Sequence, residues 1–129
     1  MSNIITKKYL IAAPIEQVWQ ALVDPTQIKE WSEASAKMGE EVAFEFELWD
    51  GDVTGVNTVI DKPSRLVQEW RGGDWPKPSV VTFELKSIDD HTEVDLTQTG
   101  HPAAETKDLT EGWDVYYMGA IKKYLEDKN

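Results

Sequence analysis

The chain contains no cysteine, so disulfide bonds, thiolate nucleophiles and sulfur-ligated zinc or iron–sulfur centres are excluded. Long apolar runs are also missing. The longest, from Tyr9 to Ile15, is interrupted by Pro14 and is far shorter than the roughly 20 residues that span a bilayer. The first residues lack the order of basic, apolar and small-residue regions that an export signal needs. We therefore expect a cytoplasmic protein with no membrane partner.

Basic residues are scarce, with 13 Lys and Arg against 24 Asp and Glu and a net charge of −11 at pH 7. This charge repels phosphate backbones, so nucleic acid is not expected as a partner. The acidity is typical of a solubilising surface, and an acidic docking face for a basic partner is the alternative. A length of 129 residues with 40% hydrophobic residues predicts a single domain over residues 1–129.

Motifs of common catalytic and metal sites are absent from the sequence. It has no Gly-rich phosphate loop, no HExxH and no GxSxG. His91 and His101 lie beside turns without metal-ligand spacing, and we expect both on the surface. Asp50-Gly51-Asp52 lacks the later ligands of a calcium loop and is interpreted as a hairpin tip. We predict no metal, no cofactor and no catalytic residue, which makes an enzyme the less favoured class.

The first third of the chain predicts a strand followed by two helices. Residues 4–11 are β-branched and apolar enough for a strand. Pro14 is suited to the first turn of a helix, and apolar residues follow it at helical spacing: Ile15, Val18, Trp19 and Leu22. Asp24-Pro25 is a second start signal, after which Ile28 and Trp31 share one face of a short helix.

From Val42 onward the pattern changes to strict alternation, which is typical of strands with one buried face. Five strands are predicted, over residues 42–49, 53–60, 65–71, 79–87 and 92–99. Their short connections favour an antiparallel meander. After Gly100 the period returns to that of a helix, and one wide apolar stripe is formed by Leu109, Trp113, Tyr116, Tyr117, Ala120, Ile121 and Tyr124. The architecture is therefore α+β, with a curved sheet wrapped around a long C-terminal helix.

Gly112 lies near the start of this predicted helix, where glycine costs about 0.5 to 1 kcal/mol relative to alanine. A structural reason should offset this cost. Our hypothesis is that the missing side chain lets a loop or strand approach closely beside Trp113.

Residues 12–22, with the sequence AAPIEQVWQAL, resemble the first helix of the SRPBCC or START-like superfamily, which includes the birch-pollen-allergen fold. A further set of residues is similar to the family of homologues of the activator of the heat-shock-protein-90 ATPase. These are Gly55, Pro63, Leu66-Val67, Trp70, Thr92-Glu93-Val94, Gly100-His101-Pro102 and Glu111-Gly112-Trp113. The resemblance covers nearly the whole chain and implies a helix-grip fold, often with an apolar cavity between sheet and helix. It implies no particular reaction.

Aromatic side chains are the strongest chemical signal, with six Trp, four Tyr and three Phe. Two interpretations are open: the rings fill the core, or they line a cavity that accepts a ligand. The candidate ligand-binding residues are Trp31, Phe44, Phe46, Leu48, Trp70, Val81, Phe83, Trp113, Tyr116 and Tyr117. Trp75, in the breaker-rich loop 71–78, either closes over a cavity mouth or pins the loop to the core.

Three functions follow from these patterns. The leading hypothesis is a non-enzymatic protein that binds a small hydrophobic or lipid-like molecule in the cavity. The alternative is an interaction module acting on a chaperone ATPase, which only the resemblance implies. The third is a cyclase-like or dehydratase-like enzyme that uses cavity tyrosines as weak acids, although a tyrosine with a pKa near 10 needs perturbation to act at neutral pH.

Overall fold

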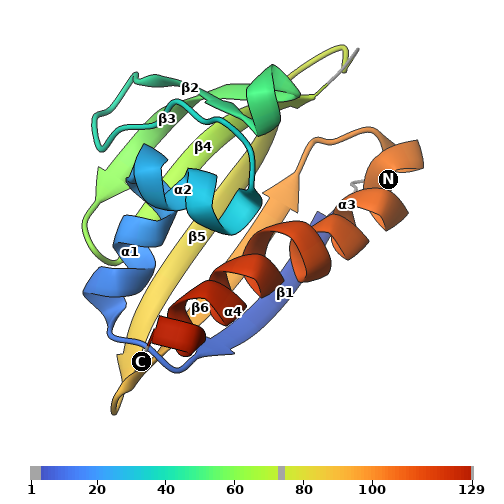
Figure 1. The fold of residues 1–129 in the computed structure, drawn as a ribbon. Coiled ribbons are helices and arrows are strands. Elements are labelled where there is room, and N and C mark those ends of the chain that lie inside the picture. Colours follow the sequence, from blue (N-terminus) through green and yellow to red (C-terminus); the bar gives the residue numbers. More distant parts are fainter. Residues whose placement is uncertain (1–3, 73–74, 129) are drawn as a thin grey trace.

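The computed structural model describes residues 4–72 and 75–128, so the start of the chain and Gly73 and Asp74 of the loop at 71–78 lie outside the described residues (Figure 1). Six antiparallel strands form one sheet in the order β1-β6-β5-β4-β3-β2. Their bounds are β1 Ile4–Ile11, β2 Glu45–Leu48, β3 Val53–Asp61, β4 Arg65–Gly72, β5 Ser79–Ile88 and β6 His91–Thr99. The predicted α+β fold, with a curved antiparallel sheet and a long C-terminal helix, is confirmed.

Two short helices follow β1, as the start signals predicted. They are α1 (Ile15–Val23) and α2 (Pro25–Ser32). Asp24 caps α2 by accepting the backbone N–H of Thr26 at 2.9 Å, and Pro25 occupies the first helical position. The Trp31 indole N–H donates to the Ala21 carbonyl at 2.8 Å, which joins α2 to α1. Figure 1 shows both helices on the same side of the sheet as the C-terminal helix.

The C-terminal helix runs without a break through three segments: α3 (Thr106–Gly112), a π-helical turn (Trp113–Tyr117) and α4 (Met118–Lys128). A π turn inserts one extra residue and so rotates the apolar stripe. Met118 consequently faces the core with no exposed surface, whereas Tyr116 is 66% exposed. The expectation that Tyr116 lies on the buried stripe, which assumed an unbroken α-helical period, is therefore wrong.

Two further expectations fail locally. The strand predicted from Val42 begins only at Glu45, because Ala43 has a left-handed φ of 71° and Val42 is 62% exposed. Phe44 thereby leaves the strand, packs over Gly39 and is only partly buried against the core. His101, expected on the surface, is buried, and its Nε2 lies 2.9 Å from the Thr106 hydroxyl in the first turn of α3.

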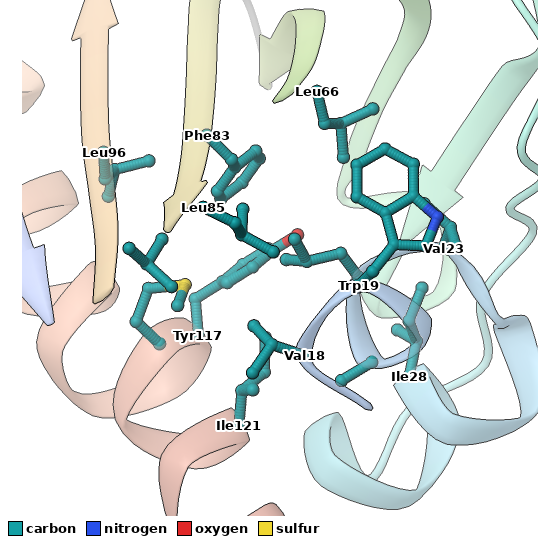
Figure 2. Close-up of a cluster of buried hydrophobic side chains, with 14 of the residues drawn as sticks. Val18, Trp19, Val23, Ile28, Leu66, Phe83, Leu85, Leu96, Tyr117 and Ile121 are labelled. Carbon is teal, nitrogen blue, oxygen red and sulfur yellow. The ribbon is translucent and has the colours of Figure 1, made fainter. Parts of the chain in front are cut away.

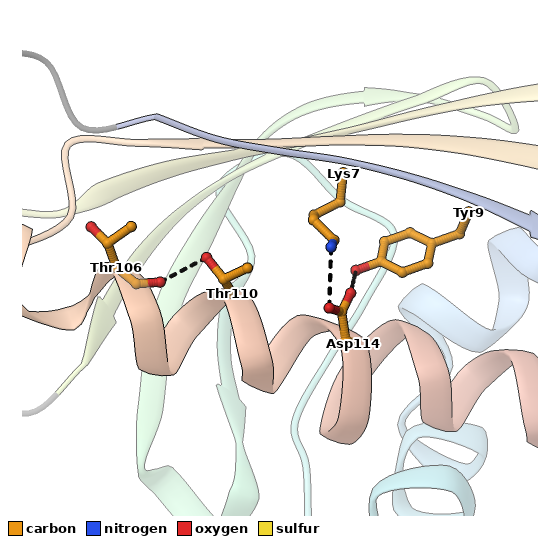
Figure 3. Close-up of polar contacts among 5 residues, drawn as sticks. All are labelled: Lys7, Tyr9, Thr106, Thr110 and Asp114. Carbon is orange, nitrogen blue, oxygen red and sulfur yellow. Dashed lines mark hydrogen bonds and ion pairs between the residues drawn. The ribbon is translucent and has the colours of Figure 1, made fainter.

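The core lies between the concave side of the sheet and the three helices, where Figure 2 shows Val18 of α1 beside Ile121 of the C-terminal helix and the Trp19 ring beside Leu66 of β4. Polar contacts fasten the helix to β1 outside this core (Figure 3). Tyr9 donates to one Asp114 oxygen at 2.8 Å and Lys7 to the other at 3.1 Å. Across the described residues, no helix combines the length and the apolar character needed to cross a membrane.

Candidate functional site

Tyr117 lies at the centre of the aromatic core. Five rings surround it, with centroid distances of 4.7 Å for Trp113, 4.8 Å for Trp31, 5.7 Å for Trp70, 5.8 Å for Phe83 and 5.9 Å for Trp49. These rings come from the C-terminal helix, α2, β4, β5 and the β2–β3 turn. The space around Tyr117, between sheet and helix, is therefore filled by aromatic side chains, which matches the core-filling interpretation for this part of the molecule.

Two buried glutamines accept the indole N–H groups of Trp70 and Trp113 inside this cluster. The Trp70 indole donates to Gln68 at 2.8 Å, and Gln68 donates in turn to the Asn57 side-chain oxygen at 2.9 Å. The Trp113 indole donates to Gln98 at 2.8 Å, and Gln98 donates to the Ser79 hydroxyl at 3.0 Å. Both indoles thus turn their polar edges to the protein, and their remaining surface is apolar.

The Tyr117 hydroxyl has no hydrogen-bond partner although it is buried. Figure 2 shows its ring extending from the helix into the apolar side chains, with the oxygen at the far end. Burial raises the pKa of Tyr117 above its ordinary value, so the hydroxyl stays protonated at neutral pH. A phenol that is this weak an acid and has no neighbouring base does not favour the hypothesis of an enzyme with tyrosine as acid.

A pocket of about 350 Å³ opens at one end of the aromatic cluster, between the first half of the C-terminal helix and the β2–β3 turn. Its lining is almost wholly apolar. The lining residues are Trp49, Val53, Trp70, Asp108, Leu109, Gly112, Trp113, Tyr116 and Tyr117. The open pocket that the second interpretation of the aromatic residues requires is therefore present at this end of the core.

The helical wall of the pocket is centred on Gly112. A Cβ atom built on Gly112 meets no atom within 4 Å. The hypothesis of a close approach beside this glycine is therefore wrong, since the missing side chain leaves open space. The close approach is found instead at Gly119, where a Cβ would collide with the Asp114 carbonyl across the π turn.

The opposite wall is the β2–β3 turn, a 3₁₀ turn at Trp49–Gly51. This turn contains Asp50 and Gly51 of the predicted hairpin tip. Trp49, Asp50 and Gly51 have left-handed φ values of 48°, 57° and 97°. For two consecutive non-glycine residues this conformation is strained. Asp50 holds the turn through two bonds with Ser35: its backbone N–H donates to the Ser35 carbonyl at 3.0 Å, and its carboxylate accepts the Ser35 N–H at 3.1 Å. The turn thereby presents the Trp49 ring to Tyr117.

The structure places the ten candidate ligand-binding residues in three groups. Trp70, Trp113, Tyr116 and Tyr117 line the pocket, with Tyr116 at its rim. Phe44 packs over Gly39, away from the pocket. The other five lie in the packed core behind the pocket: Trp31, Phe46, Leu48, Val81 and Phe83.

Five lining residues were not predicted: Trp49, Val53, Asp108, Leu109 and Gly112. Helical spacing contains a signal for two of them, because Leu109 precedes Trp113 and Gly112 precedes Tyr116 by four residues. Trp49 carries no such signal, because strict alternation assigned it to the solvent side of the strand.

Trp75 anchors the loop that follows β4. Its ring packs against Gly72, where a Cβ would stand 3.2 Å from a Trp75 ring carbon, and its backbone N–H donates to the Gly72 carbonyl at 3.1 Å. Of the two roles considered for Trp75, the structure shows the pinned loop.

A family model described as "Activator of Hsp90 ATPase homolog 1-like protein" matches residues 12–126. The chain belongs to this family. The match runs from the turn before α1 into the last turn of α4, so every residue that lines the pocket lies within it. The family resemblance seen in the sequence is thus confirmed.

Relatives with assigned names are Hsp90 activators. The human "Activator of 90 kDa heat shock protein ATPase homolog 1" is 27% identical over 123 residues, which are 94% of this chain and 36% of that protein. The Dictyostelium discoideum homologue of the same activator is 30% identical over 108 residues, 81% of this chain and 28% of that protein. The chain therefore spans about a third of the length of these relatives.

Solved structures share the fold over nearly the whole chain. An HSP90 activator from Plasmodium falciparum, PFC0360w, superposes with a TM-score of 0.86 and 28% identity, covering 98% of this chain and 96% of that one. CalU16 from Micromonospora echinospora superposes with a TM-score of 0.84 and 22% identity, covering 98% and 78%. At the identity of CalU16, the likeness shows the fold alone.

Proposed function

We propose that this chain binds a small, largely apolar molecule in the pocket between the β2–β3 turn and the C-terminal helix. The observation that carries the proposal is Gly112. Glycine in a helix costs about 0.5 to 1 kcal/mol relative to alanine, and no close contact here requires it. What the missing side chain does provide is open space at the helical wall of the pocket. A binding site is a physical reason to tolerate that cost.

The size and chemistry of the pocket support this function. Its volume of about 350 Å³ lies within the roughly 300 to 1,000 Å³ of small-molecule sites. Because Trp70 and Trp113 are only 3% and 2% exposed and already donate their N–H groups to glutamines, they offer a ligand a small area of ring surface and no hydrogen bond. Affinity would come mainly from burying apolar surface, at about 25 cal/mol per Å², and from ring stacking.

The test compares the wild-type chain with Gly112→Leu, which fills the pocket from the helix. Lys123→Leu, exposed on α4 and outside the pocket lining, is the matched control. Native mass spectrometry detects co-purifying compounds, and a thermal-shift screen covers sterols, polyphenols, fatty acids and aromatic amines. We expect a compound that stabilises the wild type and Lys123→Leu but not Gly112→Leu, because only a ligand of the pocket depends on that space. No stabilising compound, or one that acts equally on all three chains, counts against the proposal.

A second function is favoured by the superposition with the Plasmodium HSP90 activator, whose chain is covered almost completely. Under this proposal the domain binds a heat-shock-protein-90 homologue and raises its ATPase rate. The net charge of −11 requires a basic docking face on the chaperone, so binding should weaken as salt is added.

The chaperone proposal is tested with an ATPase assay and a pull-down on the heat-shock-protein-90 homologue of the same cell. An increased rate that saturates with added chain supports it, and an unchanged rate eliminates it. Gly112→Leu separates the two functions, because it blocks the pocket without changing the charge of the surface.

A further inference from the structure

We propose that the pocket selects cationic ligands, namely small aromatic compounds that carry a quaternary or tertiary ammonium group. This inference rests on the proposed ligand-binding function and adds the class of ligand. Its basis is the composition of the pocket wall. Within residues 4–72 and 75–128, nine residues line the pocket, of which five are aromatic and one, Asp108, is charged.

The aromatic residues that line the pocket come from separate elements. Trp49 comes from the β2–β3 turn, Trp70 from β4, and Trp113, Tyr116 and Tyr117 from the C-terminal helix. The faces of such rings carry negative potential, and an ammonium group within about 6 Å of a ring centre is attracted to them. Ring groups of this kind recognise quaternary ammonium ions in proteins.

The orientation of the two central indoles strengthens this effect. The N–H edge of an indole is its positive end and would repel a cation. In Trp70 and Trp113 that edge is bonded to the buried side chains of Gln68 and Gln98. Their ring centroids lie 4.9 Å apart. Because the two residues are only 3% and 2% exposed, they contribute a small area of ring surface to the pocket wall, and their positive edges are neutralised within the core.

The charge at the pocket has one sign. Asp108, which is itself exposed, lines it, and among the described residues no Lys, Arg or His does. Asp50 and Asp52, both exposed, flank the lining turn. Lys107 is exposed beside Asp108 in sequence but does not line the pocket. A fatty acid or another anion would thus meet a carboxylate and find no cation with which to pair, whereas an ammonium group would find both a counter-ion and ring faces.

Asp108 also has a purely structural role, because it lies in the first turn of α3, where a carboxylate interacts favourably with the helix dipole. Removing its charge can therefore change the stability of the helix whatever the ligand. The test must measure a ratio of affinities, because a structural role affects charged and neutral ligands alike.

The probes are benzyltrimethylammonium and neopentylbenzene, which have the same shape and differ by the replacement of N⁺ with carbon. Quenching of tryptophan fluorescence reports binding, since three tryptophans line the pocket, and calorimetry verifies it. The chains are the wild type, Asp108→Asn and Glu111→Gln. Glu111 is an exposed acid on the same helix outside the pocket lining, so its substitution changes the net charge equally.

We expect the wild type to bind the cation about threefold to tenfold more tightly than the neutral compound at low salt. Asp108→Asn should lower the affinity for the cation severalfold and leave that for the neutral compound unchanged, and Glu111→Gln should retain the preference. Equal affinities for both probes in the wild type would overturn the cation preference and leave the ligand-binding function standing. If neither probe binds, up to the solubility limit of the neutral one, both proposals fail.

Discussion

The ring centroids of Trp70 and Trp113 lie 4.9 Å apart, with an angle of 35° between the ring planes. Each indole donates its N–H to a glutamine, and the two glutamines lie on strands separated by one other strand of the sheet. Gln68 on β4 serves the first indole and Gln98 on β6 the second. This pairing lets two large amphipathic side chains fill a dry core without an unpaired donor. It also affects the neighbouring pocket. Because both N–H groups are already bonded to glutamines, neither indole has a hydrogen-bond donor left for a ligand.

Gln98→Leu is expected to destabilise the protein by about 1 to 3 kcal/mol, because it leaves the Trp113 N–H buried without an acceptor. Urea denaturation measures the change. A double-mutant cycle with Trp113→Phe isolates the cause, since the glutamine should matter less once the N–H is gone. An equal cost in both backgrounds would show that the effect comes from packing alone.

Tyr117→Phe should leave stability unchanged or raise it by up to about 1 kcal/mol, because the removed hydroxyl is buried without a partner. Tyr9→Phe is the matched control, since it loses the 2.8 Å bond to Asp114 and should cost about 0.5 to 1.5 kcal/mol. Burial raises the folded-state pKa of Tyr117, so the wild type should also lose stability relative to Tyr117→Phe above about pH 10. A clear destabilisation by Tyr117→Phe at neutral pH would mean that the hydroxyl has a partner in solution.

Much of this architecture could be predicted from the sequence, because each element carries its own local signal. The pairs Pro14 with Ile15 and Asp24 with Pro25 mark both short helices, and alternation marks the strands. The failures have a common physical origin in backbone irregularity. The left-handed Ala43 ends the alternation before β2, and the π turn rotates Tyr116 outward. Neither irregularity can be recognised from the spacing of hydrophobic residues in the sequence.

The candidate site was predicted less well than the fold, for a similar reason. Large rings were assigned to a cavity because they are apolar, yet rings such as Phe83 pack so closely that they fill it. The pocket depends instead on Gly112, which has no side chain, and on Trp49. Trp49 lies in a strained turn, so the alternating pattern of the strand does not predict where its ring points. Both features depend on tertiary contacts that no local pattern records.

Gly112→Ala is expected to stabilise the protein by about 0.5 to 1 kcal/mol, because the added methyl group enters open space and alanine favours the helix. Gly119→Ala makes the same change seven residues later and should instead destabilise by about 1 to 3 kcal/mol, since its Cβ would strike the Asp114 carbonyl. Urea melts of the two variants compare them directly. A destabilising Gly112→Ala would restore the hypothesis of a close approach at this position.

Asp114 links stability to pH through its contacts with β1. Burial raises the pKa of its carboxyl, but the hydrogen bonds from Tyr9 and Lys7 outweigh burial and leave the folded-state pKa below its ordinary value. A carboxyl with a lowered pKa stabilises the fold above its unfolded pKa of about 3.9, and that contribution is lost as the pH falls through the folded value. Asp114→Asn should therefore be less stable than the wild type near neutrality and equally stable in strong acid. The effect should be modest, because the side chain is 44% exposed.

Glu126 provides an independent check of the same acid dependence. Hydrogen bonds from Lys122 and from the Ala12 backbone N–H lower its pKa, and the bond from Ala12 joins the end of α4 to the residue after β1. Glu126→Gln should repeat the behaviour of Asp114→Asn, and the double variant should show an additive loss near neutrality, because the two sites share no partner. Urea midpoints near pH 7 and near pH 2 for all four chains measure this, since both carboxyls are charged at the first pH and largely protonated at the second. A difference that persists at the acid pH would assign the contacts a packing role independent of charge.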